Sequence, residues 1–297
     1  MSTTVFAFPG NEALARVIAE RIDASIGTLF LHRFPDGETY VRLDTDVNDG
    51  GAIFICTLNE PDAKLLPLLF AAGAARDQGA RRVGIVAPYL AYLRQDTRFK
   101  PGEAITSRTF ARLVSGTADW ILTVDPHLHR YGSLAAVYSI ATRVVHTAPL
   151  ISQWVRANVS RPLLIGPDSE SEQWVAEVAN AADAPYVVLE KTRRGDREVE
   201  VSIPDVARHR DRTPVLIDDI VSTARTMIAA IARLRAAALP PPVCVVVHAL
   251  FAGDAYPTLE AAGATRIVSC NTVPHASNGI DVNEAIADCV REWARRW

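Results

Sequence analysis

The chain has 297 residues, 49% hydrophobic and 22% charged, which is the composition of an ordinary folded protein of one or two domains. Its net charge of −3 leaves no basic excess, so we expect no nucleic-acid partner and no anionic membrane surface as a partner. No charged start followed by an apolar stretch and no membrane-length apolar run occurs, so we expect a cytoplasmic protein. Its four cysteines are widely spaced, which favours buried thiols over a metal or redox motif.

Short apolar runs rich in β-branched residues alternate with amphipathic segments along almost the whole chain. The expected strands, in chain order, are 5–8, 52–56, 82–88, 120–126, 163–168, 215–219 and 243–250. The expected helices are 11–22, 64–79, 169–182 and 223–238. Such alternation predicts an α/β fold in which parallel strands are joined by right-handed helical crossovers.

The strand and helix pattern begins afresh near 147–163, after roughly the length of a typical domain. We therefore predict two similar halves, 1–147 and 148–297, that are not separated by a low-complexity linker. The last segment, 282–297, is an amphipathic helix that the sequence assigns to neither half, and packing on the N-terminal half is one option.

The stretch VLIDDIVSTARTM, residues 215–227, places two adjacent carboxylates, Asp218 and Asp219, at the expected end of a buried strand. A strand followed by a hydroxyl-rich turn and a helix offers unpaired N–H groups and a favourable dipole, which suits a phosphate. The two carboxylates can accept hydrogen bonds from neighbouring sugar hydroxyls, so the stretch suits a sugar phosphate. The alternative is a solvated turn in which Asp219 or Ser222 caps the helix.

This stretch resembles the phosphoribosyl diphosphate loop of the phosphoribosyltransferase fold. Further segments resemble, in order and spacing, the signature segments of the ribose-phosphate diphosphokinase family: RFPDGETYVRL (33–43), 88–108, TVDPHLHRYG (123–132), GPDSE (166–170) and EKTRRGDREVEV (190–201). The short segments LEKTR and RFKPGEAI are closer to the archaeal-type branch. The resemblance implies two tandem phosphoribosyltransferase-like domains, each a mainly parallel sheet flanked by helices.

The resemblance also implies an activity, the transfer of a diphosphoryl group from ATP to the 1-hydroxyl of ribose 5-phosphate. By the same resemblance, the ATP-binding residues are Phe34, Asp36, Gly37, Glu38, Arg94 and Gln95. Alone, Pro-Asp-Gly is only a tight turn and Arg-Gln-Asp only a solvated pair. In this family the loop at 34–38 reaches a neighbouring subunit, so a homo-oligomer with a shared ATP site is implied.

The remaining roles are implied in the same way. The predicted ribose 5-phosphate site consists of Arg193, Asp218, Asp219, Ser222, Thr223, Ala224, Arg225 and Thr226. Lys191 and Arg193 are the implied catalytic cations, although a charge run is more often a solvated hairpin. His127 and Asp168 are the implied residues at Mg²⁺, a metal that keeps several waters and borrows phosphate oxygens.

One residue of the loop departs from the family pattern: Arg225 stands where glycine is usual. If the backbone there is left-handed, a side chain costs about 1–2 kcal/mol and Arg225 could obstruct the sugar. Alternatively, Arg225 adds a cation near the 5-phosphate. The sequence therefore leaves open an impaired or non-catalytic regulatory homologue, and also a nucleobase phosphoribosyltransferase, which would not explain the motifs at 34–38 and 94–96.

Overall fold

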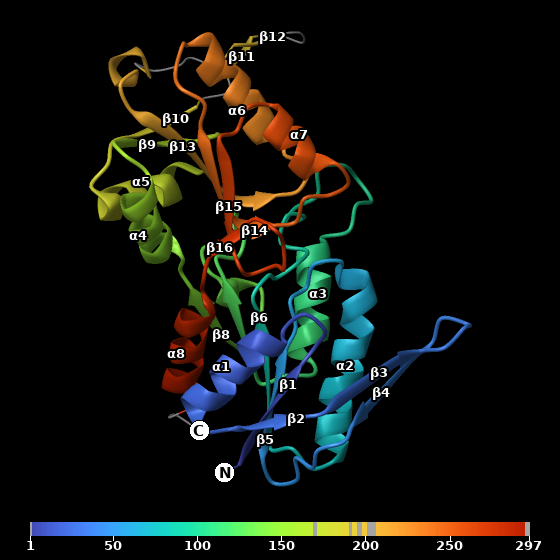
Figure 1. Cartoon of the computed structure of the whole chain (residues 1–297). Coiled ribbons are helices and arrows are strands. Elements are labelled where there is room, and N and C mark those ends of the chain that lie inside the picture. The colour runs from blue at the N-terminus through green and yellow to red at the C-terminus, as the bar shows by residue number, and fades with distance from the viewer. Residues whose placement is uncertain (1, 169–170, 190–191, 195–197, 201–205, 295–297) are drawn as a thin grey trace. The chain divides into compact units, whose positions relative to one another are not determined.

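The structure is a computed structural model that describes residues 2–168, 171–189, 192–194, 198–200 and 206–294. The chain divides into two compact units (Figure 1). Unit 1 comprises Met1–Val145 together with Asn283–Trp297, and unit 2 comprises His146–Val282. Among the described helices, none is both long enough and apolar enough to span a membrane.

Unit 1 contains a six-stranded parallel sheet with the strand order β2-β1-β5-β6-β7-β8. The sheet strands are β1 (Thr3–Ala7), β2 (Ser25–Gly27), β5 (Gly51–Ile55), β6 (Arg82–Ala87), β7 (Trp120–Val124) and β8 (Ala141–Val145). The helices are α1 (Glu12–Ile22), α2 (Pro61–Asp77), α3 (Thr106–Ser115), the short 3₁₀ helix η1 (Leu134–Ala136) and α8 (Asn283–Ala294). Strands β5 and β7 are buried throughout, because helices cover both faces of the sheet (Figure 1).

An antiparallel hairpin stands apart from this sheet (Figure 1). Its strands are β3 (Leu29–Arg33) and β4 (Thr39–Leu43), and β4 packs against α2. Residues alternate between the two faces, so Phe30 and Tyr40 are exposed while Leu43 is buried.

Unit 2 has the same arrangement, with the strand order β10-β9-β13-β14-β15-β16. Its sheet strands are β9 (Pro162–Gly166), β10 (Tyr186–Val188), β13 (Thr213–Val221), β14 (Val243–Ala249), β15 (Arg266–Cys270) and β16 (Asn278–Ile280). The helices are α4 (Ala148–Asn158), α5 (Glu172–Ala182), η3 (Val206–His209), α6 (Arg225–Ala236) and α7 (Ala255–Ala261), and a second hairpin pairs β11 (Thr192–Arg194) with β12 (Glu198–Glu200). The predicted α/β fold with mainly parallel sheets is confirmed.

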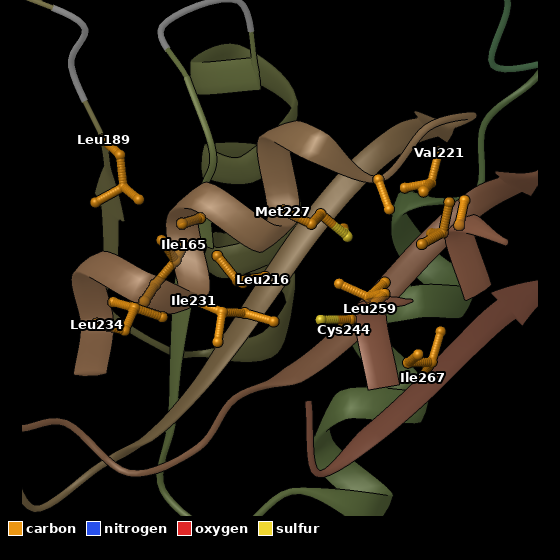
Figure 2. Close-up of a cluster of buried hydrophobic side chains, with 14 of the residues drawn as sticks. Ile165, Leu189, Leu216, Val221, Met227, Ile231, Leu234, Cys244, Leu259 and Ile267 are labelled. Atoms are coloured by element: carbon orange, nitrogen blue, oxygen red, sulfur yellow. The ribbon is translucent and has the colours of Figure 1, made fainter. Parts of the chain in front are cut away.

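The core of unit 2 explains why the helix after the acidic pair forms where it does. Met227, Ile231 and Leu234 recur at helical spacing and are buried against strands β9, β13 and β14, as Figure 2 shows. Helix α6 begins at Arg225 and ends at Ala236, before the Pro240–Pro242 run. The helix therefore carries its N-terminus to the carboxyl ends of the strands.

One helix of each unit directly follows, in sequence, a strand of the other unit. Helix α4 follows β8 in sequence, yet it belongs to unit 2 and packs against α5. Helix α8 follows β16, yet it belongs to unit 1 and packs against α1. Arg21 of α1 forms ion pairs with Glu284 and Asp288 of α8, and the ring of Trp293 lies 5.2 Å from that of Trp120.

We expect Ile286→Ala to destabilise unit 1, because Ile286 is fully buried on α8. Deleting such a side chain typically costs about 2–5 kcal/mol in the free energy of unfolding. Glu292→Ala, at an exposed position of the same helix, is the control and should change stability by less than about 0.5 kcal/mol. Denaturant unfolding followed by circular dichroism measures both variants, and equal midpoints would contradict the packing of α8.

Candidate functional site

The acidic pair of unit 2 lies within strand β13, not at its end. The strand runs on to Val221, two residues beyond the expected end at Asp219, because β14 continues to pair with it at Ile220 and Val221. The expected boundary at Asp219 was therefore wrong. Asp218 and Asp219 are partly buried, and the turn that follows comprises only Ser222, Thr223 and Ala224.

The loop after β14 holds this turn through backbone hydrogen bonds. The N–H groups of Leu250 and Phe251 donate to the carbonyl oxygen of Val221, at 3.1 and 3.0 Å, and that of Ala252 donates to Ser222 O at 2.9 Å. Main-chain hydrogen bonds between the ends of two neighbouring parallel strands thus fix the position of the turn. The phosphate-loop candidate is consequently built on a rigid edge of the sheet.

The left-handed residue in the turn is Ala224, with φ 57°, whereas Arg225 is the first residue of α6. The expectation of strain at Arg225 was therefore wrong. The conformational cost of about 1–2 kcal/mol falls on Ala224, whose side chain is small and buried. The side chain of Arg225 is exposed. Arginine is accommodated at this position without backbone strain.

The N-cap residue of α6 is Ala224, which makes no side-chain cap hydrogen bond. Neither Asp219 nor Ser222 is therefore the N-cap residue of this helix. The first N–H groups of an α-helix have no partners within the helix, and the helix dipole adds partial positive charge there. With no acidic residue in its first turn, this helix end suits an anion such as a phosphate.

The carboxylates beside this turn are held in an unfavourable electrostatic state. The pKa of Asp218 is raised well above its usual range, first by burial and then by the negative charges of Asp219 and Asp168. The backbone N–H of Asp219 donates to Asp218 Oδ1 at 3.0 Å and opposes this shift in part. A hydrogen-bond donor or a cation at this edge would relieve the repulsion, so the arrangement is suited to sugar hydroxyls and to a divalent ion.

Asp168 follows strand β9, next to β13 in the sheet. Its carbonyl oxygen accepts hydrogen bonds from the Ser171 hydroxyl and N–H, at 2.6 and 3.2 Å. His127 follows β7 in unit 1, partly buried, with its ring 6.3 Å from that of His129. Among the described residues no three His, Cys, Asp or Glu side chains gather closely enough to hold a metal ion.

The predicted adenine loop is the tip of the β3–β4 hairpin. The Phe34 N–H donates to Glu38 O at 2.8 Å, the Gly37 N–H donates to Phe34 O at 2.9 Å, and the Glu38 N–H donates to Asp36 Oδ1 at 3.1 Å. Gly37 has φ 95°, a left-handed conformation that glycine adopts without cost. Phe34 is 42% exposed, with its ring 4.9 Å from that of His32, so part of this aromatic ring is accessible to a ligand.

The second predicted ATP contact lies on the loop between β6 and α3. Arg94 is exposed, while Gln95 is held by the start of α3. The Thr106 hydroxyl donates to Gln95 Oε1 at 3.2 Å, and the Ser107 N–H donates to Gln95 O at 3.4 Å. The structure therefore fixes the main chain here and leaves the Arg94 guanidinium accessible.

The predicted catalytic cations fall largely beyond what the structure describes. Lys191 lies outside the described residues. Arg193 belongs to β11, opposite Val199 of β12, and its side chain is not described. Strands β11 and β12 pair antiparallel, as in the hairpin that the sequence left open as the alternative for this charged segment.

The sequence reading missed Phe251 as a support of the turn. Phe251 has φ 32°, which is rare for a residue with a Cβ, and its ring packs 5.1 Å from Tyr256 and 4.7 Å from His275. Its N–H is one of those that hold Val221. The position of Phe251 just after a buried strand, at the ligand edge of the sheet, was the available signal.

Comparisons with known proteins agree with this organisation. A family model described as the N-terminal domain of ribose phosphate pyrophosphokinase matches residues 3–117, and one described as a phosphoribosyl transferase domain matches residues 133–285. A crystal structure of phosphoribosylpyrophosphate synthetase from Mycobacterium smegmatis has the same fold, with a TM-score of 0.87 at 22% identity over 100% of both chains. The fold and the site thus define a two-domain protein of the phosphoribosyltransferase type.

Similarity in sequence extends over nearly the whole chain. A ribose-phosphate pyrophosphokinase of Methanopyrus kandleri is 34% identical over 93% of this chain and 94% of its own length. Those of Methanobrevibacter smithii and Thermoplasma acidophilum are 29% and 30% identical, over 95% and 96% of this chain and 98% of their own lengths. The chain belongs to the ribose-phosphate pyrophosphokinase family, also called diphosphokinases, and these archaeal relatives agree with the archaeal-type resemblance.

Proposed function

We propose that this chain is a ribose-phosphate pyrophosphokinase, which converts ATP and ribose 5-phosphate to phosphoribosyl diphosphate and AMP. The observation that carries the proposal is the edge of unit 2, where repelling carboxylates adjoin a helix N-terminus with no side-chain cap. The family membership supplies the reaction. A bond forms between the sugar O1 and the β-phosphorus of ATP, and the bond from that phosphorus to the α,β-bridging oxygen breaks as AMP leaves.

In this proposal unit 2 binds the sugar. Asp218 and Asp219 accept hydrogen bonds from the ribose hydroxyls, which offsets the burial and the repulsion that together raise the Asp218 pKa. The N–H groups of the turn at 222–226 bind the 5-phosphate at the start of α6. The exposed side chain of Arg225 adds positive charge at that same helix end.

In this proposal unit 1 binds the nucleotide through Phe34, Asp36, Gly37, Glu38, Arg94 and Gln95. The exposed ring of Phe34 and the accessible guanidinium of Arg94 suit stacking on a base and contact with phosphate. Mg²⁺, when bound, would neutralise charge on the ATP phosphates. His127 and Asp168 would be its residues, directly or through water.

Lys191 and Arg193 are proposed to stabilise the negative charge that moves towards AMP in the transition state.

The proposal also includes a homo-oligomer in the cytoplasm. Exposed Phe30, Phe34 and Tyr40 on the projecting hairpin support a contact between subunits, because exposed aromatic side chains that lie together favour association.

Incubation of the purified chain with Mg²⁺ and ATP, with and without ribose 5-phosphate, tests this function. We expect AMP to appear in proportion to the sugar added, with an equal amount of phosphoribosyl diphosphate. AMP release that does not depend on sugar, or no release, would contradict the proposal. Consumption of phosphoribosyl diphosphate with a free nucleobase would instead indicate a phosphoribosyltransferase.

We expect Arg225→Gly to raise KM for ribose 5-phosphate by about three- to tenfold, because one cation near the 5-phosphate is lost. Arg225→Met is the matched control, since it removes the charge and keeps a side chain. In steady-state kinetics the two variants should have similar KM values for ribose 5-phosphate. A large fall in KM for the glycine variant would contradict the helpful cation and indicate that Arg225 obstructs the sugar.

A further inference from the structure

An ion pair with a buried carboxylate joins two loops of unit 1 that follow different strands. Arg130 Nη1 donates to Asp96 Oδ1 at 2.7 Å. The Asp96 side chain is 1% exposed, whereas that of Arg130 is 45% exposed. Asp96 follows Arg94 and Gln95 on the loop after β6, and Arg130 follows His127 on the loop after β7. The pair therefore connects the predicted nucleotide loop to the predicted metal loop.

Tyr131 reinforces the same connection. Its hydroxyl group donates to the carbonyl oxygen of Asp96 at 3.3 Å and lies 2.9 Å from the Ser107 hydroxyl at the start of α3. The guanidinium of Arg130 also lies 5.5 Å from the centre of the Phe99 ring, further along the nucleotide loop. Two successive residues of one loop thus contact the side chain and the main chain of a single residue of the other.

The energetics make Arg130 the essential member of this contact. Asp96 Oδ2 is buried and has no hydrogen-bond partner among the described residues. The compensation of the Asp96 charge in the described structure therefore comes from Arg130. Breaking a buried ion pair is far more disruptive than breaking an exposed one, because an uncompensated charge remains in a poorly solvated place. Without Arg130, Asp96 would either become neutral by taking up a proton or draw the loop towards water, and either change weakens the connection between the loops.

The opposite side of the loop is held as well. Gln95 forms hydrogen bonds with Thr106 and Ser107 of α3. The segment 94–96 is therefore fixed at its second and third residues. Arg94 is the member left exposed to a ligand. Its direction is determined by a main chain that the Asp96 and Arg130 pair keeps in place.

We propose that Asp96 and Arg130 are positioning residues that preorganise Arg94 and Gln95 for the nucleotide and couple this loop to the one that bears His127. Neither residue needs to contact ATP for this role. The effect on nucleotide affinity rests on the proposed function, whereas the coupling between the loops does not. Preorganisation of this kind lowers the conformational cost of binding.

The test compares Arg130→Met with Arg81→Met. Arg81 of the same unit forms an exposed pair with Asp49, 2.9 Å apart, that lies outside the proposed site. In the free protein, amide exchange across 92–99 should become about tenfold faster in Arg130→Met and should not change in Arg81→Met. In kinetics, KM for Mg-ATP should rise about tenfold in Arg130→Met, with KM for ribose 5-phosphate within about twofold of the wild-type value.

Equal amide exchange in the two variants would overturn the inference, whatever the activity. A parallel loss of affinity for both substrates with a lower thermal midpoint would also overturn it, because that pattern indicates general destabilisation. Arg130→Lys should recover part of the ATP affinity, since it keeps a cation for Asp96, and a lysine variant as impaired as the methionine variant would contradict the role of charge. Absence of sugar-dependent AMP release in the wild type would refute the proposed function. The comparison of amide exchange between the two variants would still test whether Arg130 couples the two loops.

Discussion

Replacement of Lys191 by alanine is expected to lower kcat for sugar-dependent AMP release by about 10³-fold or more. A cation beside the transferring group is worth most when negative charge moves towards the leaving AMP, so its loss affects the transition state more than the bound substrates. The KM values for both substrates should therefore change much less than kcat. Steady-state kinetics with AMP as the measured product tests this expectation.

Two variants serve as controls for Lys191. Arg210→Ala removes an exposed cation elsewhere in unit 2 and should leave kcat within about twofold of the wild-type value. Lys191→Arg keeps the charge with a different shape and should be impaired less than the alanine variant. Nearly normal turnover in Lys191→Ala would remove this residue from the mechanism. Equal losses in Lys191→Ala and Arg210→Ala would indicate a nonspecific effect of charge.

Much of the fold could be predicted because its core positions repeat with simple periods. The apolar runs expected as strands at 82–88 and 120–126 form β6 and β7, which are buried except at Arg82. Met227, Ile231 and Leu234 form the buried stripe of α6. Helices α3 and α7 are not predicted by the pattern. The first opens with Thr106 and Ser107, which are weak helix formers, and the second is short and contains a proline, so packing rather than propensity stabilises them.

The candidate site was predictable in its residue types but not in its geometry. That carboxylates and hydroxyls gather after Ile217 is visible in the sequence, since the carboxyl ends of parallel strands meet at one edge. The left-handed Ala224 is not, because the choice between positions 224 and 225 depends on how β14 holds the turn. Nor is the pairing of Asp96 with Arg130, which requires two loops 34 residues apart in sequence to meet.

The acidic pair is a place where local stability and the proposed function conflict. Burial and the charges of Asp219 and Asp168 raise the pKa of Asp218, which means that its charged form is destabilised in the fold. A chain selected only for stability would not keep a carboxylate there. Conflicts of this kind concentrate at functional sites, where a ligand supplies the missing interaction. Removing the charge should therefore separate the two properties.

Asp218→Asn is expected to raise KM for ribose 5-phosphate by about 10- to 100-fold, because a hydrogen bond to a charged group is worth about 1.5–3 kcal/mol. The same change should raise the free energy of unfolding at neutral pH without Mg²⁺, by about 0.5–2 kcal/mol, since the repulsion and the burial of charge are both relieved. The amide oxygen of asparagine can keep the hydrogen bond from the Asp219 N–H.

The control for Asp218→Asn is Asp211→Asn, which removes a carboxylate from an exposed pair with Arg161 in the same unit. Exposed pairs contribute little, so this variant should keep its KM and change stability by less than about 1 kcal/mol. Kinetics and denaturant unfolding in a chelating buffer measure both variants. An unchanged sugar KM would exclude Asp218 from sugar binding. A clear loss of stability would show that its charge stabilises the fold, and the conflict between stability and function at this edge of the sheet would then not exist.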